Sequence, residues 1–157
     1  MLPQIHDKYV TSGKVEIVFL DLPLRMHPHA FNAAEAAGCA GEQSRFWEMY
    51  RRLFSNQRTL APSQLRAHAE AIGLDLAAFD KCVAGGRQEA KIQEDVRVTQ
   101  MLGIAGTPAF LLGNRIAGTD KVEVVDVVRG LPPVAELEKR LDALLAEEAA
   151  PKGSKRP

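Results

Sequence analysis

The chain opens with apolar residues at helical spacing and continues with a short apolar run. Leu2, Ile5 and Tyr9 follow the period of one helix face, and Gly13 is a suitable stop for that helix. Residues 14–22 then contain a near-continuous apolar run, Val15, Ile17, Val18, Phe19 and Leu20, which predicts a strand buried on both faces of its sheet. Pro23 ends this strand.

The middle of the chain is dominated by helical periodicity interrupted by glycine and proline. An Ala-rich helix follows Pro28, and after two glycines the pattern resumes with a strong aromatic stripe. This stripe consists of Phe46, Trp47, Tyr50, Leu53 and Phe54. The other predicted helices are Pro62–Ile72, Leu76–Ala84 with Asp75 as its N-cap, and about Arg87–Leu102 with Gly103 as its stop.

Two short strands and a last helix complete the pattern. The predicted strands are Ala109–Leu112 and Val122–Val128, and the helix follows Pro132 and Pro133. The order of elements predicts an α/β protein, a thioredoxin-like fold with a helical insertion over approximately residues 28–102. In this interpretation the first β-strand and the start of the first helix are missing. We predict one domain over residues 1–150 and a disordered basic tail over residues 151–157.

Composition narrows the classes of function. Twenty basic residues balance twenty acidic ones, which argues against nucleic acid as the main partner. No apolar run is long enough for a membrane span, and the N-terminus lacks the pattern of a signal peptide. Two cysteines are too few for a disulfide-rich scaffold.

The most informative local signal is the pair Thr107-Pro108 between a glycine-containing loop and an apolar strand. This context is typical of the cis-proline loop of thioredoxin-like proteins, and cis peptide bonds are essentially confined to X-Pro. The alternative is a trans proline at the first residue of an edge strand. We interpret the bond as cis because of the flanking pattern.

Over nearly its whole length, from Leu2 to about Leu145, the chain resembles the DsbA-like thiol–disulfide oxidoreductases. The order and spacing of several segments carry this resemblance. They are Leu22-Pro23-Leu24, His27-Pro28-His29-Ala30, Ala37-Gly38-Cys39-Ala40, residues 43–49, residues 53–57, Ile72-Gly73-Leu74-Asp75, Phe79-Asp80-Lys81-Cys82 and residues 102–108.

The chain departs from this family at its redox motif. Such proteins carry Cys-x-x-Cys at the start of the first helix, and this sequence contains no Cys-x-x-Cys. Exchange requires a thiolate of depressed pKa and a nearby resolving thiol. We expect the motif to lie upstream of Met1, so the chain as written should lack the exchange activity of the family.

The resemblance also suggests a role for Cys39 and Cys82. The corresponding positions of some DsbA-like relatives form a second, non-catalytic disulfide, so this pair is a candidate structural disulfide. Two buried reduced thiols that act as small hydrophobic groups are the alternative. A redox-active pair is a third interpretation.

Other patterns favour structural interpretations over sites. His27 and His29 could suggest a metal, but zinc sites need more ligands at closer spacing, so we predict no metal site. The aromatic stripe could bind peptides, although such spacing more often belongs to a core. The loop Gly103–Gly106 precedes a strand and lacks the lysine of a phosphate-binding loop.

From these observations we predict that the chain is a domain of the thiol–disulfide oxidoreductase family, which acts in disulfide formation or isomerisation. Unfolded or cysteine-containing proteins are the expected partners, with Thr107 and Pro108 in contact with substrate and no cofactor required. The alternatives are a non-catalytic, peptide-binding or chaperone-like module and a glutathione-using relative. A homodimer through an exposed strand edge is left open. The resemblance implies a bacterial periplasmic or envelope location; because the chain carries no signal peptide, the location would be cytoplasmic if Met1 is the genuine start.

Overall fold

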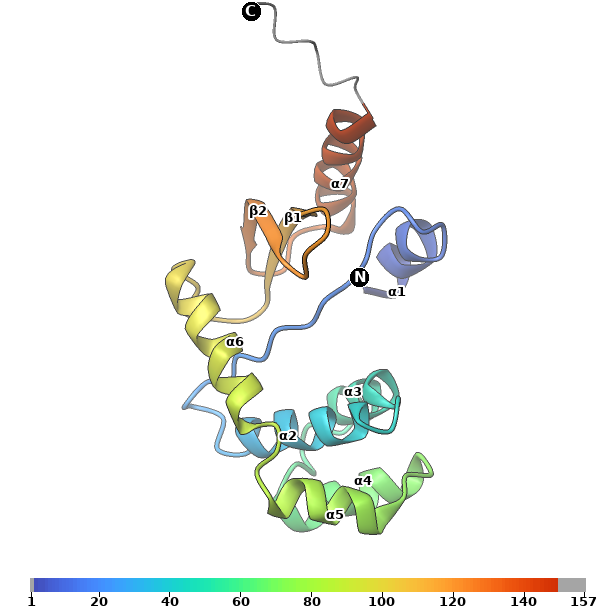
Figure 1. Cartoon of the computed structure of the whole chain (residues 1–157), viewed down its shortest axis with the longest axis vertical. Coiled ribbons are helices and arrows are strands. Elements are labelled where there is room, and N and C mark those ends of the chain that lie inside the picture. The colour runs from blue at the N-terminus through green and yellow to red at the C-terminus, as the bar shows by residue number, and fades with distance from the viewer. Residues whose placement is uncertain (1, 150–157) are drawn as a thin grey trace, which may run out of the picture. The chain divides into compact units, whose positions relative to one another are not determined.

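The computed structural model describes residues 2–149, and its elements fall into two compact units (Figure 1). One unit comprises the described parts of Met1–Phe19 and Gly106–Pro157, and the other comprises Leu20–Ala105. The first contains α1 (Leu2–Ile5), η1 (His6–Val10), β1 (Ala109–Arg115), β2 (Val122–Arg129) and α7 (Val134–Ala149). The second contains α2 (Ala30–Gly41), α3 (Phe46–Ser55), α4 (Pro62–Ala71), α5 (Leu76–Ala84) and α6 (Glu89–Met101). The prediction of a mixed α/β chain, made from the order of its elements, is confirmed.

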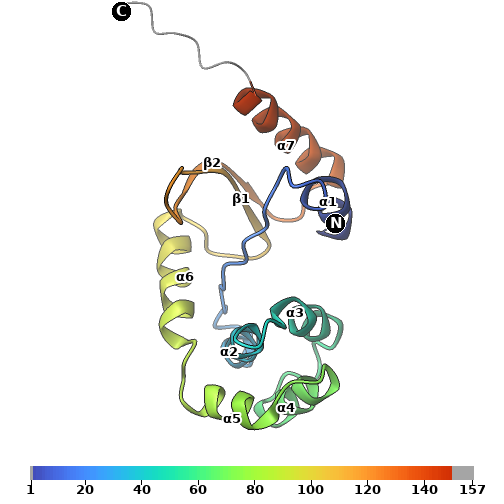
Figure 2. The ribbon, with the colours of Figure 1, turned by 45° about the vertical axis from the view of Figure 1, so that its right-hand side comes forward.

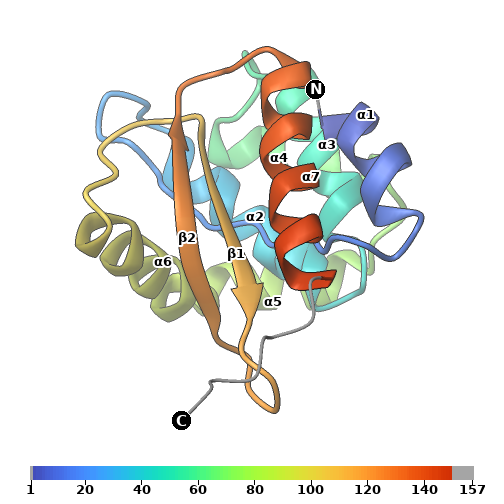
Figure 3. The same ribbon diagram turned by 90° about the horizontal axis from the view of Figure 1, so that it is seen from above.

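The first unit has a core between the β-hairpin and its helices. Figure 3 shows β1 and β2 side by side, with α7 alongside them. Six buried apolar residues form this core: Ile5, Tyr9, Leu112, Val128, Leu137 and Leu141. The Tyr9 hydroxyl donates a hydrogen bond of 2.9 Å to the Asp142 carboxylate. The predicted first helix is confirmed, although its second part, His6–Val10, is π-helical.

The prediction of a strand over residues 14–22 is wrong. Residues 15–20 carry no strand or helix, and their exposure alternates, so that Val15 and Ile17 pack in the core while Val18 is 62% exposed. The segment is therefore not buried on both faces. A strand exists only when a neighbouring strand takes up its backbone hydrogen bonds, and no other strand of residues 2–149 does so here.

The antiparallel pair β1–β2 contains an irregularity that explains one glycine. Leu112 pairs with Asp126, but the next residue, Gly113, pairs with Val124, so β2 contributes one extra residue. At this bulge the strands approach so closely that a Cβ on Gly113 would overlap the carbonyl oxygen of Glu123. Glycine is thus required at position 113 by backbone proximity.

The second unit is helical, and Figure 2 shows α2, α3, α4 and α5 gathered together. The predicted bounds of α5 are confirmed, and the Asp75 carboxylate caps it by accepting the N–H groups of Ala77 and Ala78 at 2.9 and 3.1 Å. The helices enclose a core of eleven buried residues: Ala36, Ala37, Cys39, Ala40, Met49, Leu53, Leu65, Ala69, Leu74, Phe79 and Cys82.

The aromatic stripe of α3 only partly belongs to this core, contrary to the favoured prediction. Met49 and Leu53 are the side chains of α3 that are buried. Trp47 is 38% exposed and Phe54 is 54% exposed. The small alanine residues of α2 and the thioether of Met49 fill the core, which leaves part of the aromatic face outside it. The predicted tail, residues 151–157, lies outside the described residues.

Candidate functional site

The loop that leads into β1 presents Thr107 and Pro108 at the surface. Both residues are exposed, and the peptide bond between them is cis. The Pro108 carbonyl accepts the Gly130 N–H at 2.8 Å, which ties the loop to the residue that follows β2. Gly130 has a φ of 81°, a left-handed conformation that glycine adopts at no steric cost. The loop is therefore held in place by the hairpin while its side chains stay accessible.

One edge of β1 has no strand partner among residues 2–149, because the sheet consists of β1 and β2. The bond between Gly130 and Pro108 marks a hydrogen-bonded pair, so the following residue, Ala109, lies opposite Arg129 in a non-hydrogen-bonded pair. By the alternation of antiparallel strands, the backbone groups of Ala109 and Leu111 point away from β2. This edge, next to Thr107, can accept an extended polypeptide.

Cys39 and Cys82 form a disulfide that joins α2 to α5. Their sulfurs are 2.01 Å apart, and both residues are 1% exposed. The Glu42 carboxylate lies 3.5 Å from the Cys82 sulfur and is held by Arg87 and by the Gln88 amide. Because the sulfurs are buried, an attacking thiolate cannot reach them in the folded chain. The pair fits a structural role.

A charged cluster that the sequence analysis missed lies in the second unit. Asp21 and Asp95 are buried, and the Asp95 carboxylate accepts the Asp21 backbone N–H at 3.0 Å and the Lys91 ammonium at 2.7 Å. Burial raises the pKa of Asp21 above its ordinary value, although the charge of Lys91 opposes this change. Burial lowers the pKa of Lys91, but its hydrogen bond to Asp95 and the charge of Asp21 raise that pKa overall. The cluster anchors the chain at residue 21 to α6.

We expect Asp21→Asn to stabilise the chain at neutral pH relative to the unchanged chain. A raised pKa in the folded state means that the folded chain binds the Asp21 proton more tightly than the unfolded chain does. The ionised carboxyl therefore costs stability at pH 7, and this cost disappears as the pH falls through the folded pKa.

Urea unfolding of both proteins between about pH 7 and pH 4 measures this effect. The difference in unfolding free energy should shrink as the pH falls. A difference that stays constant or grows on acidification contradicts the expectation. Asp120→Asn, at an exposed position, is the matched control.

The histidines do not assemble with other ligands. His27 and His29 are exposed, whereas His68 is buried and its Nδ1 accepts the Arg52 Nε–H at 3.0 Å. Within the described part of the chain, no group of three or more His, Cys, Asp or Glu side chains is placed to hold a metal ion. Thr107 and Pro108 thus remain the predicted site residues that are accessible.

Comparison with known proteins gives relatives that are much longer than this chain. It is 38% identical over 114 residues to a Na(+)/H(+) antiporter NhaA 3 of Salinispora tropica, an alignment that covers 72% of this chain and 18% of the relative. It is 36% identical over 125 residues to a Na(+)/H(+) antiporter NhaA 1 of Salinispora arenicola, covering 78% of this chain and 19% of that protein. The chain therefore spans less than a fifth of the length of these relatives. No solved structure matches it.

The part of the chain between residues 2 and 149 includes no helix that is both long and apolar enough to cross a membrane. A family model described as Thioredoxin matches residues 1–126, which is most of the chain. The match runs from the first helix through the Thr107-Pro108 loop and β1 into β2. The chain therefore belongs to this thioredoxin family.

Proposed function

We propose that this chain is a DsbA-like domain that binds extended, cysteine-containing segments of other proteins for disulfide formation or isomerisation. Thr107, Pro108 and the edge of β1 form the binding site. One observation supports this proposal most strongly. The Thr107-Pro108 loop, which the hairpin holds in place, adjoins the edge of β1, and the backbone groups along that edge have no strand partner in residues 2–149. An extended segment that adds to this edge gains main-chain hydrogen bonds independent of its sequence. This suits a domain that handles many unfolded substrates.

The geometry separates substrate binding from exchange chemistry. Exchange proceeds by attack of a thiolate on a disulfide, and both cysteines of the chain are already joined in a buried disulfide. We therefore expect this chain alone to bind peptides without reducing insulin. Turnover of insulin by the chain as it stands would contradict this assignment of roles.

We expect Ala109→Pro to weaken peptide binding about five-fold. Proline removes the N–H of Ala109, which points away from β2, so a bound strand loses one main-chain hydrogen bond worth about 1 kcal/mol. The pairing of β1 with β2 does not use this N–H. Ala109→Val keeps the N–H and is the matched control, expected within about two-fold of the unchanged chain.

Fluorescence anisotropy with a labelled, valine-rich peptide that contains one cysteine measures this binding. Equal affinities of the proline and valine variants would show that the edge of β1 is not the binding site. A second copy of this chain is a competing occupant of the edge. A monomer in sedimentation at tens of micromolar excludes that occupant, whereas a dimer lost in the proline variant supports it.

A non-catalytic, peptide-binding module is the second candidate, favoured by the absence of a free cysteine from the described residues. The two candidates differ in what precedes the codon of Met1 in the gene. An in-frame coding sequence for a β-strand followed by Cys-x-x-Cys supports the oxidoreductase. Stop codons at that place support the module. For the oxidoreductase we propose the bacterial envelope, because the disulfide between Cys39 and Cys82 suits an oxidising compartment.

A further inference from the structure

Helix α3 carries a continuous ladder of aromatic rings on a face that is partly exposed. Ring centroids are 5.4 Å apart for Trp47 and Tyr50 and 4.4 Å apart for Tyr50 and Phe54. Trp47 is 38% exposed and Phe54 is 54% exposed, so the ladder presents a connected apolar surface to solvent. The rings of Trp47 and Phe54 are not part of the core, to which α3 contributes the buried side chains of Met49 and Leu53.

The same helix and the turn after it carry an excess of positive charge in a chain that is neutral overall. Residues 45–58 contain four arginines and a single glutamate, Glu48. Arg45 pairs with Glu48 at 3.1 Å, and the Arg52 Nε–H is donated to His68. Arg51 and Arg58 are exposed, and in residues 2–149 neither forms an ion pair, although the charge of Arg51 helps to lower the pKa of the nearby Glu48. These two guanidinium groups are available to an anionic partner.

The charged and aromatic side chains share one face. Arg51 follows Trp47 by four positions and precedes Phe54 by three, so the three residues lie in one row on the helix. Arg58 follows at the next turn of the chain, just beyond the end of α3. Along this row, apolar side chains (Trp47 and Phe54) therefore alternate with cationic ones (Arg51 and Arg58).

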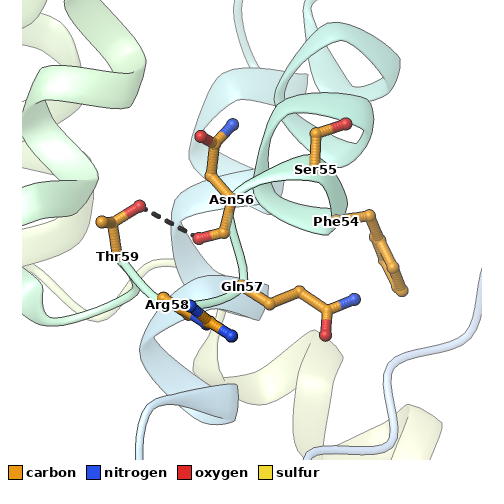
Figure 4. Close-up of a pocket in the computed structure, with 6 residues that line it drawn as sticks. All are labelled: Phe54, Ser55, Asn56, Gln57, Arg58 and Thr59. Carbon is orange, nitrogen blue, oxygen red and sulfur yellow. Dashed lines mark hydrogen bonds between the residues drawn. The ribbon is translucent and has the colours of Figure 1, made fainter.

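Two hollows flank the end of this row. One of about 410 Å³ is lined by six consecutive residues, Phe54 to Thr59 (Figure 4). The other, of about 380 Å³, is lined by Glu48, Arg51, Arg52, Ser55, Asn56 and Ile72. The first has no acidic residue in its lining, and the second has one, so both suit side chains that carry a carboxylate.

We propose that this face of α3 binds an acidic peptide segment that contains apolar side chains. Its carboxylates pair with Arg51 and Arg58, and an apolar side chain packs on Phe54 beside the first hollow. The neutral charge of the chain as a whole disfavours a polyanion such as nucleic acid. This site does not use Thr107, Pro108 or β1, so it stands independently of the proposed function.

Trp47 is the only tryptophan of the chain, which makes its fluorescence a direct reporter. The probe is a peptide of about ten residues that alternates glutamate with leucine, and the control probe has lysine in place of every glutamate. We expect saturable changes in Trp47 emission with the acidic probe and none with the basic probe. The double substitution Arg51→Gln and Arg58→Gln should weaken binding about ten-fold, since two charge-assisted contacts are lost.

Arg25→Gln is the matched control variant, because Arg25 is exposed and lies outside α3. It should bind the acidic probe as the unchanged chain does. Equal weakening by Arg25→Gln, or equal binding of the basic probe, overturns the proposal because the attraction would then be unspecific. A response of Trp47 to vesicles with anionic lipid but not to the acidic peptide also overturns it. Urea unfolding of each variant verifies that the chain stays folded.

Discussion

Reduction of the disulfide between Cys39 and Cys82 is expected to lower the unfolding free energy by about 4 kcal/mol. The bond closes a loop with a sequence separation of 43 between α2 and α5. In the chain-entropy model, opening this loop frees the unfolded chain far more than the folded chain. Because stabilities of 5–15 kcal/mol are typical of domains, a loss of about 4 kcal/mol is a large fraction.

Urea unfolding with and without a strong thiol reductant measures this loss. The variant with both Cys39→Ala and Cys82→Ala should unfold at the lower urea concentration whether or not reductant is present. Each cysteine is 1% exposed in a packed core, so alanine also removes buried sulfur contacts, and the double variant should be at least as unstable as the reduced chain. A midpoint that is equal in the unchanged and doubly substituted chains would show that the disulfide does not stabilise the fold.

Gly113→Ala is expected to destabilise the hairpin by about 3 kcal/mol. A Cβ at this position would overlap the carbonyl oxygen of Glu123 and lie 2.8 Å from Cγ1 of Val122. The carbonyl is part of the paired backbone, so it cannot move aside without loss of the register between β1 and β2. The same substitution should weaken peptide binding, because β1 provides the proposed edge.

Gly106→Ala provides the control, since a Cβ there meets nothing within 4 Å and its backbone is not left-handed. Thermal unfolding of the two variants gives the comparison. We expect Gly106→Ala to remain within about 0.5 kcal/mol of the unchanged chain. Equal stability of the Gly113→Ala variant would mean that the close approach of the two strands does not constrain residue 113.

Elements with local signals could be predicted from the sequence. The start and the end of the helix Leu76–Ala84 are both marked by adjacent residues, because Asp75 caps its start and Gly85 follows its end. The Thr107-Pro108 loop and the two strands that follow it were also recognised from their immediate neighbours. In these cases the residues that determine the structure are only a few positions apart.

Features that depend on distant residues could not be predicted. The apolar run at residues 14–22 has the composition of a strand, but strand formation depends on a partner elsewhere in the fold. The contact of Asp21 with Asp95 joins residues 74 positions apart, and no local pattern indicates it. The exposure of Trp47 and Phe54 likewise depends on which face of α3 meets α2 and α4, and the periodicity of one helix does not contain that information.

The candidate site likewise combines features that neighbouring residues predict with features that depend on distant parts of the chain. The sequence context of Thr107 and Pro108 predicts these two residues as contacts for a substrate. The open edge of β1 beside them follows only from the sheet, in which β1 pairs with β2 on one side. Arg51 and Arg58 were not recognised, because a charged residue on a helix is usually solvated and its lack of a partner is visible only in three dimensions.

Amide hydrogen exchange at Ala109 and Leu111 tests the central claim most directly. These N–H groups point away from β2, and we expect them to exchange quickly in the free chain. With a valine-rich, cysteine-containing peptide at about ten times its Kd, their exchange should slow about ten-fold. Binding of that peptide with no slowing at either amide would contradict the claim that the edge of β1 beside Thr107 and Pro108 holds an extended polypeptide.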